Sequence, residues 1–120
     1  MILHNSTTGQ IFICTQCLKI HLEFGHFTID FTSEAQLKNF LNHLEQVDGP
    51  HYEDLNKSTS YRRKVMVPIP DAGLKMLFTS NELDEIRNLI RGFIGRNKKE
   101  LVSVTRIEVD IRTLMLKHLN

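Results

Sequence analysis

The sequence has little of what marks an exported or membrane-inserted protein. It holds two cysteines, three prolines and no tryptophan among 120 residues. Two cysteines three positions apart cannot cross-link a fold, so packing must stabilise the domain. The longest apolar runs, such as Ile11–Cys14, fall far short of the ~20 residues that span a bilayer. Residues 1–5 lack the basic and apolar segments of a signal peptide. We therefore expect a cytoplasmic protein outside the membrane.

An excess of charge of one sign is also missing. Fifteen Lys and Arg residues face fourteen Asp and Glu residues, which gives a net charge of +1. Such a balance provides no general electrostatic attraction to nucleic acid or to an anionic membrane. The composition, 41% hydrophobic and 24% charged, is that of a soluble globular protein. We expect one domain over residues 1–120.

One pattern occurs twice in the chain, as a hairpin followed by Phe-Thr-Ser and an amphipathic helix. The first unit covers residues 10–47 and the second covers residues 62–95. In each, apolar residues alternate with polar ones on both sides of a turn, which predicts a half-buried hairpin. The expected cross-strand pairs are Ile20–Phe31, Leu22–Ile29 and Phe24–Phe27, then Val65–Phe78, Val67–Met76 and Ile69–Leu74.

Capping sequences and apolar stripes predict the helix in each unit. Ser33 is followed three residues later by Gln36, and Thr79 by Glu82, the spacing of a capping box. Apolar residues then recur at helical spacing. The predicted buried stripes are Leu37, Phe40, Leu41, Leu44 and Val47, then Leu83, Ile86, Leu89, Ile90 and Phe93.

The two units predict an α+β fold, with an antiparallel sheet of four to five strands and two or three helices on one face. Residues 11–14 could add a strand before the first hairpin. Residues 48–61 are polar and without periodicity, which predicts a long loop. Residues 101–120 fit a strand or a capped helix, and we favour the helix. Its two apolar faces suggest contact with a second copy of the chain.

The chemical feature outside this scaffold is Cys14-Thr15-Gln16-Cys17. Two cysteines at this spacing form half of a structural zinc site, which needs two further ligands. His4, upstream, and His21, on the strand face of Cys17, are the candidates, and His26 lies at the far end of the hairpin. No second Cys-x-x-Cys exists, so a complete site would need histidines or a neighbouring chain. We include zinc, held by Cys14, Cys17, His4 and His21, among the candidate cofactors.

His21 is a difficult ligand if the chain from Cys17 is extended. Four residues at ~3.3 Å each would separate the two Cα atoms by about 13 Å, too far for one zinc ion to bridge well. His21 can join the site only if the chain curls at Leu18–Lys19. Asp30, directly across the predicted hairpin, is the partner that the pairing favours.

Two other uses of these residues remain open. Cys14 and Cys17 could perform thiol–disulfide exchange, although reactive pairs usually precede a helix rather than a strand. Arg62–Lys64 and the basic end of the second helix could bind nucleic acid weakly, although no aromatic residues are interleaved with them. Gly-rich phosphate loops, nucleophile elbows and His-Glu-x-x-His are absent, so we do not expect an enzyme.

Three segments together resemble a family of small uncharacterised bacterial proteins. They are Cys14–Cys17, the strand ending at Phe24-Gly25, and the helix entry Phe31-Thr32-Ser33-Glu34. The resemblance covers residues 10–95 and implies the layout above without an activity. We expect a non-catalytic module that binds a protein partner or itself, with zinc at the cysteine pair.

Overall fold

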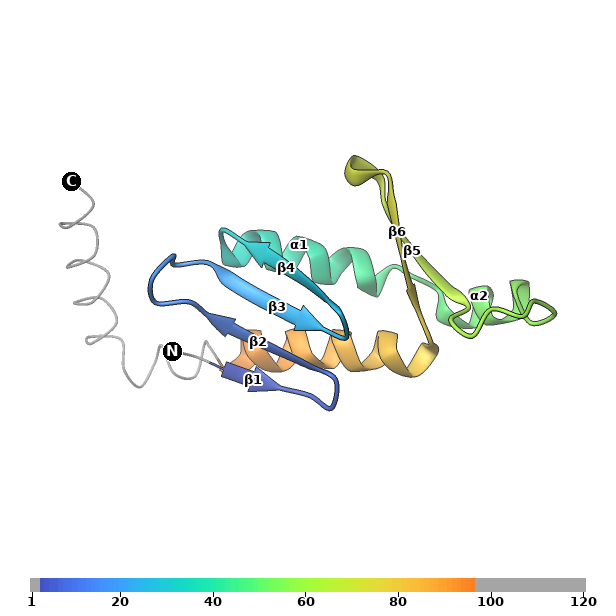
Figure 1. The fold of residues 1–120 in the computed structure, drawn as a ribbon, viewed down its shortest axis with the longest axis horizontal. Helices are drawn as coiled ribbons and strands as arrows, with labels where there is room; N and C mark the ends of the chain where they lie inside the picture. Colours follow the sequence, from blue (N-terminus) through green and yellow to red (C-terminus); the bar gives the residue numbers. More distant parts are fainter. Residues whose placement is uncertain (1–2, 97–120) are drawn as a thin grey trace.

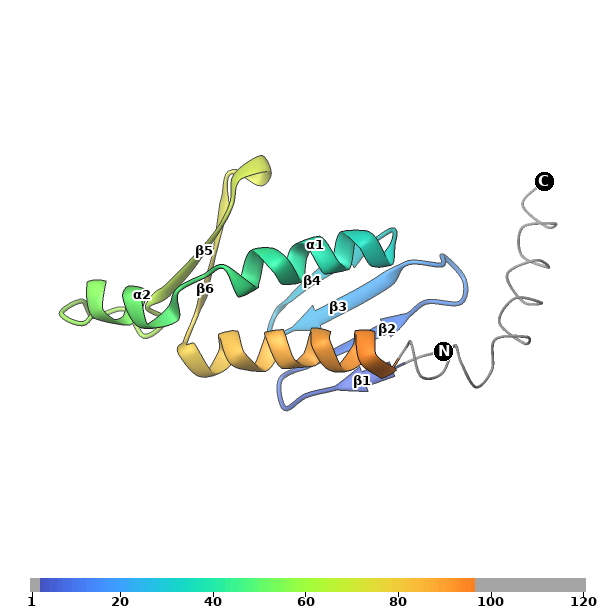
Figure 2. The same cartoon turned by 180° about the vertical axis from the view of Figure 1, so that it is seen from behind.

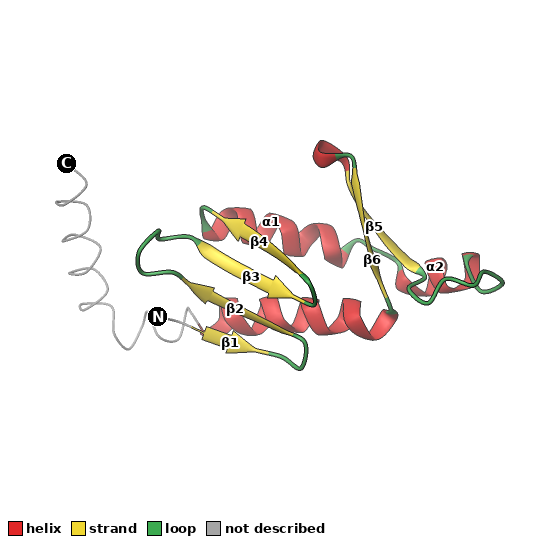
Figure 3. Cartoon of the chain, viewed as in Figure 1, coloured by secondary structure: helices red, strands yellow, loops and turns green. Residues whose placement is uncertain are grey.

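The computed structural model describes residues 3–96. The segment 101–120, expected to be a helix, lies outside the described residues. The strands are β1 (Leu3–Asn5), β2 (Gly9–Ile13), β3 (Ile20–Phe24), β4 (Phe27–Phe31), β5 (Val65–Ile69) and β6 (Leu74–Phe78). The helices are α1 (Glu34–Glu45), α2 (Gly49–Leu55), a 3-10 turn at Pro70–Ala72 and a long helix over residues 80–96. Helices and strands are both well represented, so the α+β class is confirmed (Figure 3).

Four strands form an antiparallel sheet in the order β1-β2-β3-β4. The register of the first hairpin pairs Leu22 with Ile29 and Phe24 with Phe27, as the alternation predicts. Gly25 has φ +59°, a left-handed conformation that glycine adopts without steric cost and that closes the two-residue turn. Strand β1 extends the sheet beyond the expected strands.

Both long helices cover one face of this sheet, and they lie side by side there. Figure 1 shows them behind the strands, and Figure 2, from the other side, shows them in front. Their apolar stripes meet alternate residues of the strands in one core. The buried members are Ile11, Ile20, Leu22, Phe24, Phe31, Leu37, Leu44, Val65, Val67, Phe78, Leu83, Ile86, Leu89, Ile90 and Phe93. Both predicted stripes therefore face the sheet.

The capping residues act as the sequence predicts. The Ser33 hydroxyl accepts a hydrogen bond from the Gln36 N–H at 3.2 Å. At the second helix, the Glu82 N–H donates to Thr79 Oγ1 at 3.0 Å and the Thr79 N–H donates to Glu82 Oε1 at 2.8 Å. These bonds satisfy backbone donors that a helix start leaves without an intrahelical partner.

The second hairpin departs from the expected single sheet. Its register pairs Val67 with Met76, as predicted, but β5 and β6 form a separate two-stranded sheet. Figure 1 shows this hairpin standing between the four-stranded sheet and α2 and projecting past α1. Phe78 anchors its base by packing edge-on against Phe24 and Phe27, with ring centroids 6.1 and 6.4 Å apart. We call β5, the 3-10 turn and β6 the arm.

The polar segment 48–61 is not the continuous loop that its composition predicts, because it contains α2. The Asp48 carboxylate accepts from the His51 N–H at 3.0 Å, and Pro50 occupies the first turn, where its missing N–H costs nothing. Asp48-Gly49-Pro50 therefore follows the end of α1 and also forms the start of α2. None of the helices among residues 3–96 is long and apolar enough to cross a membrane.

Candidate metal centre

The connection from β2 to β3 folds into a tight turn that carries both cysteines. The Leu18 N–H donates to the Cys14 carbonyl at 3.0 Å, and the Cys14 N–H donates to the Lys19 carbonyl at 2.9 Å. Leu18 has φ +59°, the only non-glycine residue in 3–96 with a positive φ. This left-handed residue reverses the chain, which re-enters the sheet at Ile20.

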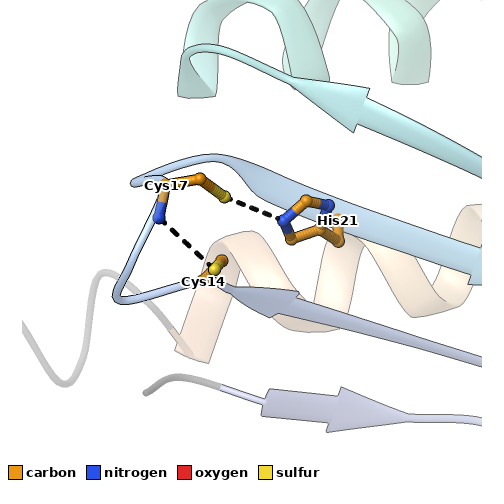
Figure 4. Close-up of side chains that lie close together, drawn as sticks. All are labelled: Cys14, Cys17 and His21. Carbon is orange, nitrogen blue, oxygen red and sulfur yellow. Dashed lines mark hydrogen bonds between the residues drawn. The ribbon is translucent and has the colours of Figure 1, made fainter.

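The reversal brings three donor atoms together at the end of the sheet. Cys17 Sγ lies 3.2 Å from His21 Nε2, and the Cys17 N–H points at Cys14 Sγ, 3.4 Å away (Figure 4). The ligand atoms of Cys14, Cys17 and His21 all lie within 4.8 Å of one another. We call these three residues the Cys–Cys–His cluster.

The premise that argued against His21, an extended chain from Cys17, is therefore wrong. That estimate of about 13 Å assumed continuous strand from Cys17 to His21. Strand β3 begins only at Ile20, and the left-handed Leu18 turns the chain so that Cys17 Sγ reaches His21 Nε2. The curl at Leu18–Lys19, stated as the condition for His21 to join the site, is present.

The opposite nitrogen of the same imidazole contacts Asp30. His21 Nδ1 lies 2.6 Å from Asp30 Oδ1, because the register places these residues directly opposite each other on β3 and β4. His21 thus has both contacts that the sequence offered as alternatives. An Nδ1–H bonded to a carboxylate leaves Nε2 available as a ligand.

These hydrogen bonds shift the acid–base behaviour of the cluster. The bond to Asp30, followed by the contact with Cys17, raises the pKa of His21 to about 9. The Cys17 N–H, followed by the Cys17 side chain, lowers the pKa of the Cys14 thiol to about 7. Near neutral pH and without metal, His21 is therefore protonated, and Cys14 loses its proton more readily than an ordinary cysteine. A metal ion would replace the proton on Nε2 and release it.

The donor set and spacing are suited to a thiophilic cation. Zinc bonds to sulfur at ~2.3 Å and to histidine nitrogen at ~2.0–2.1 Å. In a tetrahedral site these lengths put a sulfur and a nitrogen ligand about 3.6 Å apart. The 3.2 Å between Cys17 Sγ and His21 Nε2 is close to this value. Cys14, Cys17 and His21 could hold a metal ion, with a fourth position outside the cluster.

His4, the remaining predicted ligand, is not brought to this cluster. It pairs with Ile11 on the helix-facing side of the sheet, whereas His21 pairs with Phe12 on the opposite side. The His4 ring packs so closely against Gly92 that a Cβ at position 92 would overlap Nε2. His26 lies beyond the other end of β3, in the turn before β4.

Several basic residues considered for nucleic-acid binding contact other parts of the chain. Arg63 forms a two-point hydrogen bond with Glu82, and Arg91 lies 2.6 Å from Glu45. Arg87 donates to the Leu44 and Val47 carbonyls and so satisfies the end of α1. These guanidinium groups have structural partners.

Sequence reasoning missed a second feature, a cleft of about 750 Å³ between the arm and the sheet. It lies where β4 and α1 face β6, and its wall is mainly apolar. The large apolar side chains that line it are Phe24, Phe27, Ile29, Phe40, Ile69, Leu74, Met76, Leu77 and Phe78. Cross-strand alternation could not reveal it, because it forms between two separate sheets.

Comparison with known proteins gives one match. Neither the curated proteins nor the solved structures contain a match to this chain. A family model matches residues 1–113, beyond the residues 10–95 over which a family resemblance was expected. This match confirms that the relatives form an uncharacterised family. The chain belongs to the family of unknown function DUF6686.

Proposed function

We propose that this chain is a non-catalytic metal-binding module that holds one zinc ion through Cys14, Cys17 and His21. The observation that carries the proposal is the convergence of two thiols and one imidazole nitrogen within 4.8 Å. Two thiolates favour a soft or borderline cation over Mg²⁺ or Ca²⁺, which prefer oxygen ligands. A cytoplasmic location is consistent with the proposal because that compartment keeps thiols reduced.

Each ligand has a separate structural support. Cys14 continues from β2, Cys17 is placed by the left-handed turn, and His21 belongs to β3 and is oriented by Asp30. A ligand set drawn from two strands and their turn would tie the end of the sheet together. Bound zinc would therefore stabilise the fold at this end of the sheet.

Metal analysis of protein purified under reducing conditions tests the proposal. We expect one zinc per chain in the wild type and a loss of at least nine-tenths of it in Cys14→Ser and Cys17→Ser. His4→Ala is the matched control, because His4 is a histidine of the same sheet on the opposite face. Wild-type protein without stoichiometric metal after incubation with zinc would refute the proposal.

The arm supports self-association as a second part of the role. Leu74 and Leu77 of β6 line the apolar cleft, yet they are 55% and 48% exposed. A two-stranded hairpin is marginally stable alone in water and gains from further burial. The arm carries exposed apolar side chains and also forms a wall of the cleft. A two-fold interface requires one patch that is complementary to itself. We propose that the exposed leucines of the arm pack into the cleft of a second copy, so that one surface supplies both halves.

A further inference from the structure

We propose that oxidation of the Cys14–Cys17 pair to an intramolecular disulfide releases the metal ion, so that the cluster is a peroxide-sensitive metal switch. This inference rests on the proposed zinc site and concerns its regulation. Metal binding and thiol chemistry, which the sequence presents as alternatives, are then two states of one site.

The two sulfur atoms are placed to react with each other. They lie within 4.8 Å, and only Thr15 and Gln16 separate the two residues. A disulfide needs a sulfur separation of about 2.05 Å, so a shift of up to about 3 Å would close the bond. Thr15, Gln16 and Leu18 are all exposed, so that shift would disturb little packing.

The two thiols differ in their access to an oxidant. Cys17 is exposed at the tip of the turn, whereas Cys14 is partly buried and accepts the Cys17 N–H. A cluster with three protein ligands also leaves one coordination position uncovered. Both cysteines bind the ion as thiolates, so exposure to the oxidant decides between them. Cys17 is therefore the first point of attack, and Cys14 is the resolving thiol.

The oxidant is a hydroperoxide, and the step balances as follows. The Cys17 thiolate attacks one peroxide oxygen, the O–O bond breaks, and the leaving oxygen takes a proton to become water. The Cys14 thiolate then attacks the sulfur of the resulting Cys17 sulfenic acid. The S–S bond forms, the S–O bond breaks, and the departing hydroxide takes a second proton to become water. Two thiolates, one hydrogen peroxide and two protons yield one disulfide and two waters, with two electrons passing from sulfur to peroxide.

Loss of both thiolates leaves too few ligands to hold the ion. A disulfide sulfur no longer has the charge that binds the cation, so His21 would be the sole ligand remaining from the cluster. His21 itself stays in position because its other nitrogen is held by Asp30 on β4, outside the turn that moves. The site can therefore rebuild when the disulfide is reduced.

The test uses the full chain loaded with zinc and exposed to hydrogen peroxide. A chromogenic chelator measures released zinc, a thiol reagent counts free thiols, and mass spectrometry identifies the product. The chain has two cysteines, so the thiol count reports on this pair alone. We expect one zinc released for every two thiols lost, a mass decrease of two hydrogens, and recovery of binding after reduction and addition of zinc.

Several results would overturn the inference. They are zinc retained at peroxide concentrations that oxidise free glutathione, disulfides between chains on a non-reducing gel, and zinc released while both thiols stay free. Oxidation of the four methionines adds oxygen to the mass and is thereby distinguished. Absence of zinc from the reduced protein would refute the proposed function instead, so the two failures are separable.

Discussion

The Nδ1 atom of His21 lies 2.6 Å from Asp30 Oδ1, across the hydrogen-bonded ladder of β3 and β4. This contact fixes which imidazole nitrogen points at the cysteines. Groups of this kind, which orient a ligand without touching the metal, typically account for 10- to 100-fold in affinity. Asp30 is therefore a positioning residue for His21.

Replacing Asp30 with Asn tests that role. We expect Asp30→Asn to lower zinc affinity about 10- to 100-fold and to leave a 1:1 stoichiometry. Competition with a chelator of known affinity measures the change. Thr28→Asn, two residues earlier on the same edge strand and also exposed, is the matched control and should leave affinity unchanged. Equal affinities of Asp30→Asn and wild type would show that Asp30 does not position the imidazole.

The left-handed backbone of Leu18 gives a second prediction. Glycine adopts a φ of +59° without steric cost, whereas a β-branched residue is strained there. Leu18→Gly should hold zinc as tightly as the wild type, and Leu18→Val should bind it about fivefold more weakly, as roughly 1 kcal/mol of added strain implies. Chelator competition on both variants, with circular dichroism to check the fold, provides the measurement. A Leu18→Val variant that binds like Leu18→Gly would contradict the role of the turn.

Much of the scaffold could be predicted from the sequence because its rules are local. Alternation determined the register of both hairpins, since a one-residue slip would expose Leu22 and Ile29. Capping residues gave the start of the helix after Thr79. In contrast, separation of the arm from the main sheet depends on long-range packing of Phe78 against Phe24, which no local pattern reports.

The candidate site was only partly predictable for a similar reason. The cysteine spacing identified two ligands, and strand pairing identified Asp30 as a neighbour of His21. Whether His21 also reached Cys17 depended on one backbone angle at Leu18, and leucine carries no signal for a left-handed conformation. The face on which His4 lies depended on β1, which sequence patterns did not reveal.

The ion pair of Arg63 and Glu82 predicts how stability depends on pH. The hydrogen bond from Arg63 is the main cause that lowers the pKa of Glu82, despite partial burial that raises it. The unfolded chain therefore binds this proton at a higher pH than the folded chain. The stabilisation is fully present above the ordinary carboxyl pKa of about 4.3 and is lost as the pH falls through the lower folded value.

Glu82→Gln should accordingly make the free energy of unfolding less dependent on pH in the acid range. We expect its free energy of unfolding to fall less than that of the wild type between about pH 5 and pH 3. Urea unfolding at several pH values measures this slope, and Arg63→Gln should reduce it in the same direction by removing the partner. Identical slopes for wild type and Glu82→Gln would exclude a contribution from this pair.

If the arm mediates self-association, a charged side chain placed on the arm should weaken the dimer. Leu77→Asp should raise the dimer dissociation constant at least tenfold, because a buried unpaired carboxylate is costly. Leu55→Asp, at an exposed leucine of α2 that does not line the cleft, is the control and should associate like the wild type. Sedimentation over a range of concentrations measures both. A wild-type chain that is monomeric throughout would contradict this part of the proposal.

Cobalt(II) titration of the reduced protein tests the metal site most directly, because thiolate-to-cobalt absorption reports ligation by sulfur. We expect saturation at one cobalt per chain, displacement of cobalt by zinc, and an affinity that falls at least tenfold in His21→Ala but stays unchanged in His4→Ala. Failure to saturate at one equivalent, or equal affinities of His21→Ala and wild type, would contradict the proposed metal site.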